Sequence, residues 1–254
     1  ASGNISGVTT LTLADVGGTA ALLGDVDVTA LTVGNTVANV AFVGNGSSVA
    51  NAISFANDGT LQLGNATGDT LTFNGGLTTT SVGGTVTLQG TVATSNDAVV
   101  LGAVTLGGAV AIDTNATSNA ADITIAAITG GSNNLLLSTG NNIAGADVTA
   151  SGAISGLGNL ILADVGGTAT FSNNVAAVAL VAVNTVANII FTGSTNTFSG
   201  TGTFANDGTL TFGNSTDDSF TFNGGLITSS VAGTVTLNTS ISSSNDAMAF
   251  GAIT

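Results

Sequence analysis

The sequence contains no Lys, Arg, His, Cys, Pro, Trp or Tyr, and all 14 of its acidic residues are Asp. The formal charge of −14 is therefore uncompensated. A surface without cations repels the phosphates of nucleic acid and of anionic membranes, so nucleic-acid binding is excluded. The longest apolar stretch, 175–183, has about half the length that a membrane helix needs, and we expect no membrane insertion.

The same absences remove most of the side chains that catalyse reactions. A serine triad lacks its base, and neither a thiolate nor an imidazole metal site can form. A pair of Asp residues, as in glycosidases, is still available, either Asp25 with Asp27 or Asp217 with Asp218. Adjacent Asp residues point to opposite faces of a strand or lie solvated in a turn. We therefore predict that the chain is not an enzyme, with an Asp-dependent glycan hydrolase as a remote alternative.

The main feature that is present is an internal repeat of 149 residues. Residues 1–105 align without a gap on residues 150–254, with roughly 57 of roughly 105 pairs identical. Strings that recur at this spacing include ADVGGTA, NTVAN, FANDGTL, TFNGGL and SNDA. We therefore divide the chain into a first unit, 1–149, and a partial second unit, 150–254, that continues the first as one rod.

Short apolar-x-apolar triplets, often with Thr in the middle, recur within each unit and are typical of half-buried strands. Gly, Asn, Asp and Ser clusters between the triplets predict tight turns. The nearest helix candidate, 175–183, aligns with the alternating stretch 26–34, so we expect both to be strands. The triplets are Leu11/Leu13, Leu31/Val33, Val40/Phe42, Ile53/Phe55, Leu61/Leu63, Leu71/Phe73, Val86/Leu88, Val104/Leu106, Val110/Ile112, Ile123/Ile125, Leu135/Leu137 and Leu160/Leu162.

These short, closely spaced strands favour an all-β fold, specifically a β-solenoid (parallel β-helix) built from long internal repeats. Eight coils in each unit would give roughly 19 residues per coil, and the whole chain would hold roughly fourteen coils. The alternative is a carbohydrate- or cell-binding adhesin module made of tandem β-sandwiches. A unit of 149 residues is long for one sandwich, and the Trp core and Cys pair of immunoglobulin domains are missing.

The strings GTVTL, DGTLTFGN, TFNGGL and SNDAVVLGAVTL resemble the repetitive regions of filamentous-haemagglutinin-like exoproteins and autotransporter passenger domains. The resemblance covers the whole chain and is one of composition. It implies a right-handed β-solenoid, secretion across a bacterial outer membrane, and a role in adhesion or as a surface fibre.

Two kinds of binding site are candidates on such a rod. Asp and Asn oxygens at turns are suitable ligands for calcium, although Asp also forms turns without any metal. Outward Thr-x-Thr pairs, at Thr70/Thr72, Thr85/Thr87 and Thr209/Thr211, raise ice binding as a second remote alternative, but their spacing along the chain is irregular. The candidate weak calcium ligands are Asp58, Asp207, Asp97, Asp246, Asp69 and Asp218.

The sequence therefore predicts a structural extracellular protein that forms an elongated fibre or stalk on a bacterial surface, as a filament, a sheath or an adhesin shaft. We expect no cofactor other than possible calcium. The expected partners are further repeats or neighbouring copies of the chain, together with host or surface glycans.

Overall fold

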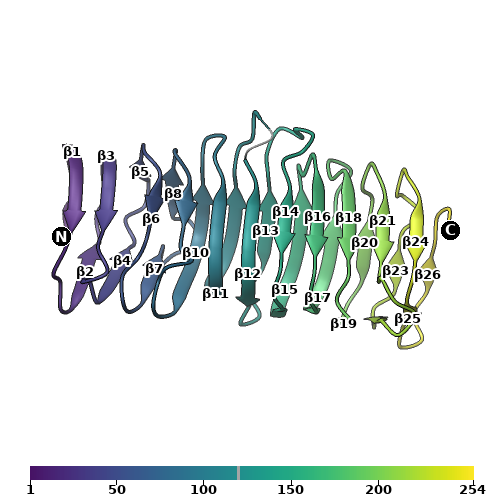
Figure 1. Ribbon diagram of the computed structural model, residues 1–254. Coiled ribbons are helices and arrows are strands. Elements are labelled where there is room, and N and C mark those ends of the chain that lie inside the picture. Colours follow the sequence, from purple (N-terminus) through teal and green to yellow (C-terminus); the bar gives the residue numbers. More distant parts are fainter. Residues whose placement is uncertain (119–120) are drawn as a thin grey trace.

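The computed structural model describes residues 1–118 and 121–254. These residues form 26 strands and no helix, and the strands join in one parallel sheet wound into a β-solenoid of about 12 turns. The coils stack along one axis, with the two termini at opposite ends of the rod (Figure 1). The prediction of an all-β solenoid is confirmed. The tandem-sandwich alternative is wrong, because each strand pairs in parallel with a strand one coil away instead of antiparallel with its neighbour in sequence.

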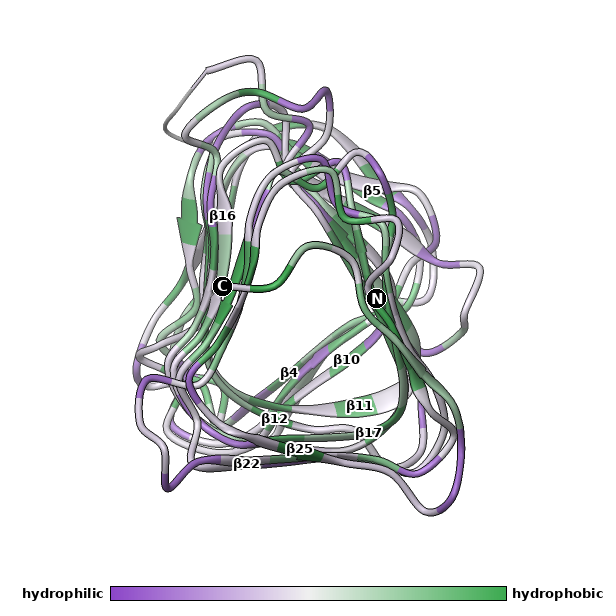
Figure 2. Ribbon diagram, turned by 90° about the vertical axis from the view of Figure 1, so that its right-hand side faces the viewer, coloured by the Kyte–Doolittle hydropathy of each residue, from purple (hydrophilic) through white to green (hydrophobic). Residues whose placement is uncertain are grey.

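The cross-section of the solenoid is a triangle, so each coil contributes one strand segment to each of three faces (Figure 2). Face I contains β2 (Thr19–Leu22), β4 (Asn39–Phe42), β7 (Leu61–Leu63), β19 (Thr195–Phe198), β22 (Ser219–Phe222) and β25 (Ser240–Ser242). Face II contains β5 (Ser47–Val49), β8 (Thr70–Phe73), β13 (Leu135–Ser138), β20 (Gly202–Phe204), β23 (Leu226–Ile227) and β26 (Met248–Ala249). Face III contains β6 (Ile53–Ser54), β9 (Leu77–Thr78), β14 (Val148–Ala150), β16 (Thr168–Phe171), β18 (Asn188–Phe191), β21 (Leu210–Phe212) and β24 (Val235–Leu237).

Seven longer strands bend round a corner and contribute to more than one face. The longest, β11, supplies a segment to all three faces, because its parts pair with β9, β10 and β13. The predicted strands at 26–34 and 175–183 are confirmed as β3 and β17. The bent strands are β1 (Ile5–Leu13), β3 (Val26–Val33), β10 (Val86–Ala93), β11 (Val99–Asp113), β12 (Ile123–Thr129), β15 (Ile154–Ala163) and β17 (Val175–Ala182).

The solenoid is right-handed. In Figure 2 the C-terminal end faces the viewer, with β5 of face II on the right, β16 of face III on the left and face I at the bottom. The chain runs from face II to face III and then to face I, so it turns anticlockwise as it approaches the viewer. This is the hand that parallel strands joined by crossovers nearly always adopt.

The core lies inside the triangle and follows from the alternation of the triplets. In β7, for example, Leu61 and Leu63 point inward and are fully buried, while Gln62 between them points outward. Like residues stack from coil to coil, as in the column of Phe171, Phe191 and Phe212, whose successive ring centroids are 4.9 and 5.8 Å apart. Such offset aromatic stacks add to the stability that burial of apolar area provides.

Some inward positions are polar and were therefore missed by the triplet pattern. The buried Ser47 hydroxyl accepts a hydrogen bond from the Val26 amide at 3.0 Å. At the aligned positions of the second unit, Asn196 Oδ1 accepts from the Val175 amide at 2.9 Å. A buried backbone amide needs a partner, and in both units a polar side chain of the next coil supplies it.

The 149-residue repeat does not span a whole number of turns. Counted along the chain, Leu22 lies in the third strand segment and on face I, whereas the aligned Phe171 lies in the twenty-third and on face III. The unit therefore holds twenty segments, or six and two-thirds turns, and the second unit is shifted by one face relative to the first. The predicted eight coils per unit and fourteen coils in total are wrong, because the whole chain forms only about 12 turns and each coil is therefore longer than predicted.

Candidate functional site

The six candidate calcium ligands are distributed over all three corners of the triangle. In the first unit, Asp58 lies between faces III and I, Asp69 between I and II, and Asp97 between II and III. The face shift moves each aligned Asp of the second unit to a different corner. Within residues 1–118 and 121–254, no group of three acidic side chains is brought together. A calcium ion at any of these turns would therefore depend on one or two carboxylates and on backbone carbonyls.

Asp69 and Asp218 have a structural role in their turns. Asp69 Oδ2 accepts hydrogen bonds from the backbone amides of Asn65 and Ala66, at 2.7 and 2.9 Å. Asp218 Oδ2 makes the same two contacts with Asn214 and Ser215, at 2.8 and 3.0 Å. Both side chains are buried. One oxygen of each carboxylate is thus already occupied by two donors, which stabilises the turn without a cation.

The other four candidates are less enclosed. Asp58 and Asp207 are exposed in the NDGT turns, where the buried Asn that precedes each Asp holds the turn by donating to backbone carbonyls. Asp97 is partly buried, and Asp246 is exposed and accepts from the Ser244 hydroxyl at 3.2 Å. These carboxylates are the ones with free oxygens for a cation from solution.

The two candidate carboxylate pairs for hydrolysis differ in their surroundings. Asp25 exchanges hydrogen bonds with Asn4, whose Oδ1 accepts from the Asp25 amide and whose Nδ2 donates to the carboxylate. Asp27 projects outward from β3. In the other pair Asp217 is exposed while Asp218 is buried in its turn, so these two carboxylates do not face a common space.

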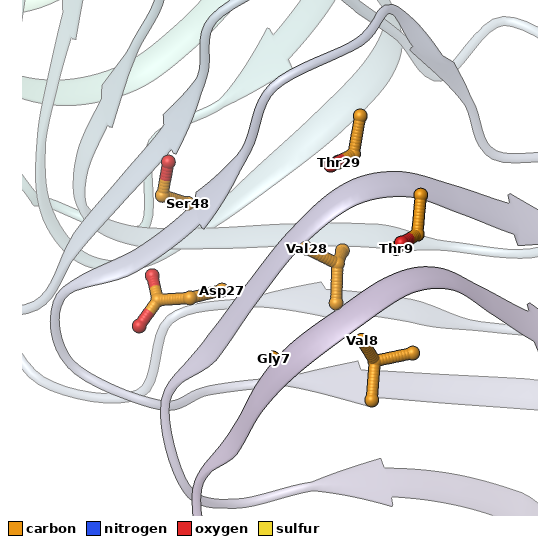
Figure 3. A pocket seen from close by; sticks show the side chains of 7 residues that line it. All are labelled: Gly7, Val8, Thr9, Asp27, Val28, Thr29 and Ser48. Carbon is orange, nitrogen blue, oxygen red and sulfur yellow. The ribbon is translucent and has the colours of Figure 1, made fainter.

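The hollows in the surface are open and lined by small residues. The one in Figure 3, about 430 Å³, lies where β1 bulges at Gly7 against β3, and Gly7 has a φ of 71°. A hollow of about 250 Å³ lies at the same bulge of the second unit, beside Gly156. Lacking aromatic and basic side chains, both offer few contacts to a small molecule. The first is lined by Gly7, Val8, Thr9, Asp27, Val28, Thr29 and Ser48.

Outward hydroxyls form a column along face III. The Thr-x-Thr pairs predicted from the sequence fall on three different faces, since Thr70/Thr72 lie on II, Thr85/Thr87 on I and Thr209/Thr211 on III. The parallel register nevertheless aligns single outward residues from coil to coil, interrupted only by Val100 and Ile190. The hydroxyl positions are Thr12, Thr32, Ser54, Thr78, Thr124, Thr149, Thr170, Thr211 and Thr236.

Face II instead carries an outward apolar stripe, which we define as Ala111, Leu136, Ile161 and Val181. Each of these residues is in register with the next, and all four are half-buried. The column continues through Thr203 to the exposed Ile227. The irregular lengths of the turns hide this alignment in the sequence, and only the register of the coils produces it.

The comparisons with known proteins give no relative: no family model, no curated protein and no solved structure matches this chain. Among the described residues there is also no helix that is long and apolar enough to cross a membrane. The function of the surfaces described above must therefore be argued from their geometry alone.

Proposed function

We propose that the chain is a structural rod of the bacterial cell surface, a length of fibre, sheath or adhesin shaft that lies outside the cell and carries no catalytic activity. The observation that supports this proposal best is that, among the described residues, parallel strands pair from coil to coil from β1 at one end of the rod to Ile253 at the other. A solenoid of this kind resists extension because each inner coil is hydrogen-bonded to both of its neighbours through its strand segments.

Side chains at the corners strengthen the coil-to-coil contacts. Asn39 Oδ1 accepts hydrogen bonds from both the amide and the hydroxyl of Thr60, at 2.8 and 2.9 Å. Asn188 makes the same pair of contacts with Thr209 in the second unit. These bonds lie at the ends of strands, where the backbone ladder stops, and they favour a rod over a flexible chain of domains.

The apolar stripe on face II supports lateral contact with a second copy of the chain. Its side chains repeat at the coil spacing of about 4.8 Å, a period that another solenoid of the same kind shares. The four stripe residues are uncharged, and Asp113 lies beside them at the end of β11, whereas the whole chain carries a charge of −14. Two rods would therefore repel each other at low salt and approach through face II once salt screens their charge.

Electron microscopy of purified residues 1–254, at several salt and protein concentrations and with and without calcium, tests the proposal. We expect thin rods about 58 Å long, from twelve coils at about 4.8 Å each. Rods that pack side by side at high salt would indicate a filament or coat, and rods that stay single would indicate a shaft. Compact particles, or hydrolysis of a surface glycan that is lost in an Asp27→Asn variant, would overturn the proposal.

Ice binding is a second candidate because of the hydroxyl column on face III, whose coil spacing is regular although its sequence spacing is not. If the column binds ice, the chain lowers the freezing point of water below its melting point, and Thr149→Leu reduces this effect. The matched control is Thr203→Leu on face II, because the residues in register with Thr203 are the apolar Val181 and Ile227. If the unsubstituted chain produces no difference between the freezing point and the melting point, this function is excluded.

A further inference from the structure

The residues that form the C-terminal end of the rod have equivalents in the first unit, and those equivalents are covered by the next coil. Residues 235–254 are the second copy of residues 86–105. The two copies follow the same path, because Val235 forms a bridge with Ile253 just as Val86 pairs with Val104. The hydroxyls of Thr236 and Thr254 also lie 3.4 Å apart.

Equivalent residues differ sharply in exposure. Val99 is 0% exposed, but the aligned Met248 is 40% exposed. Val104 is 4% exposed, and the aligned Ile253 is 47% exposed. In the first copy these positions are covered by β12, where Ile123 pairs with Val99 and Ile128 pairs with Val104.

At the N-terminal end, too, a residue is exposed whose equivalent in the other unit is buried, and there the covering coil is the preceding one. Val8 is 41% exposed, whereas the aligned Leu157 is 2% exposed. The strand that contains Leu157, β15, rests on β12 and β13 of the preceding coil. The exposed side chains at both ends therefore occupy positions that a neighbouring coil buries elsewhere in this chain.

We infer that each end of the rod is a docking surface for a further stretch of the same repeat. The C-terminal end fits strands equivalent to the last part of β11 and to β12, and the N-terminal end fits strands equivalent to β12, β13 and β14. The alignment of the two units identifies which strands would pair with each end, because Thr254 is equivalent to Thr105 and Ala1 is equivalent to Ala150. In the first unit the stretch that follows Thr105 is 106–149, and it contains the strand that covers Val99 and Val104.

This inference goes beyond the role of the rod, since a shaft and a coat would both use such ends. Parallel strand edges with exposed apolar side chains associate readily with other strands, and the repeat identifies which strands belong there. The added segments would lie one face round from their counterparts in the first unit, as the whole second unit does.

The test extends the chain at its C-terminus with a second copy of residues 106–149. Met248 is the only methionine, so its oxidation by peroxide, followed by mass spectrometry, reports on this end alone. Because oxidation follows exposure, we expect the extension to slow it by about tenfold or more. Amides of residues 240–253 should also exchange with solvent more slowly. The control carries the same 44 added residues in shuffled order (149 − 105 = 44).

Equal oxidation of Met248 in the extended and shuffled chains would overturn the inference while leaving the proposed rod intact. If the extended chain is insoluble, residues 106–149 are added to the original chain as a separate peptide. The same protection of Met248 is then expected at excess peptide, and its absence counts against the inference. Rod shape in the microscope is judged independently of this result.

Discussion

Phe42 and Phe191 are the same residue of the 149-residue repeat, yet Phe42 is buried on face I and Phe191 on face III. The cause is that each coil has three strand segments whereas each unit has twenty, and twenty is not a multiple of three. Each further unit of the same kind would shift its features by one face again, and three units would restore the original orientation. A rod built from such units presents any given surface feature in three directions.

The aromatic column on face III is expected to dominate the stability of its coils. Phe191→Ala removes a fully buried ring that stacks on both Phe171 and Phe212, and should cost about 3–5 kcal/mol of unfolding free energy. Ile190→Thr, on the outward side of the same strand, should cost less than about 1 kcal/mol. Chemical denaturation followed by circular dichroism measures both, and equal losses would contradict the assignment of the core.

The carboxylate of Asp69 is expected to stabilise its turn. Asp69→Ala leaves the amides of Asn65 and Ala66 without their acceptor and should cost about 1–3 kcal/mol. Asp58→Ala, at an exposed turn position, should change stability by less than about 0.5 kcal/mol. Thermal unfolding of the two variants side by side tests this difference, and a larger loss for Asp58→Ala would indicate a bound cation there.

Divalent cations are expected to act mainly by screening. Since the candidate ligands are distributed over three corners, calcium and magnesium at equal ionic strength should raise the melting temperature by similar amounts. A rise specific to calcium that is lost in Asp97→Asn would instead reveal a defined site at that turn. Differential scanning calorimetry in both salts distinguishes these results.

Lateral association is expected to depend on face II. Ile161→Asp places a charge in the middle of the apolar stripe and should reduce side-by-side association at high salt without unfolding the chain. The control is Thr170→Asp on face III, which adds the same charge outside the stripe. Sedimentation velocity at low and high salt measures both, and equal behaviour of the two variants would rule out the stripe as the contact.

Two glycine-to-alanine variants are expected to lose stability for different reasons, one through backbone strain and the other through a steric clash. A Cβ at Gly156 would meet nothing closer than 3.9 Å, so Gly156→Ala should cost only the strain of its φ of 63°, about 1 kcal/mol. A Cβ at Gly152 would overlap the Ala126 carbonyl oxygen of the coil below, so Gly152→Ala should cost several times more. Hydrogen exchange of β14 and β15 reports the local loss in each variant.

The sequence by itself determined the repeat and the strands whose two inward residues are apolar. Alternation such as Leu61-Gln62-Leu63 can bury only one side of a strand, and most Gly, Asn and Asp clusters are turns, although Gly107 and Gly108 lie inside the bent strand β11. It could not reveal strands whose inward residue is polar, such as β5 with Ser47. Nor did it reveal the structural role of Asp69, because a turn carboxylate that binds amides has the same local sequence as one that is free for calcium.

Only the tertiary structure decided how many residues close one coil and which residues share a face. Turn lengths vary along the chain, and a coil closes where its backbone ladder meets the coil below. Thr149, Thr170 and Thr211 therefore align although their spacing in sequence is uneven, and Leu136 aligns with Ile161 to make the apolar stripe. The face shift between units has the same origin, since it depends on the number of segments and not on the identity of any residue.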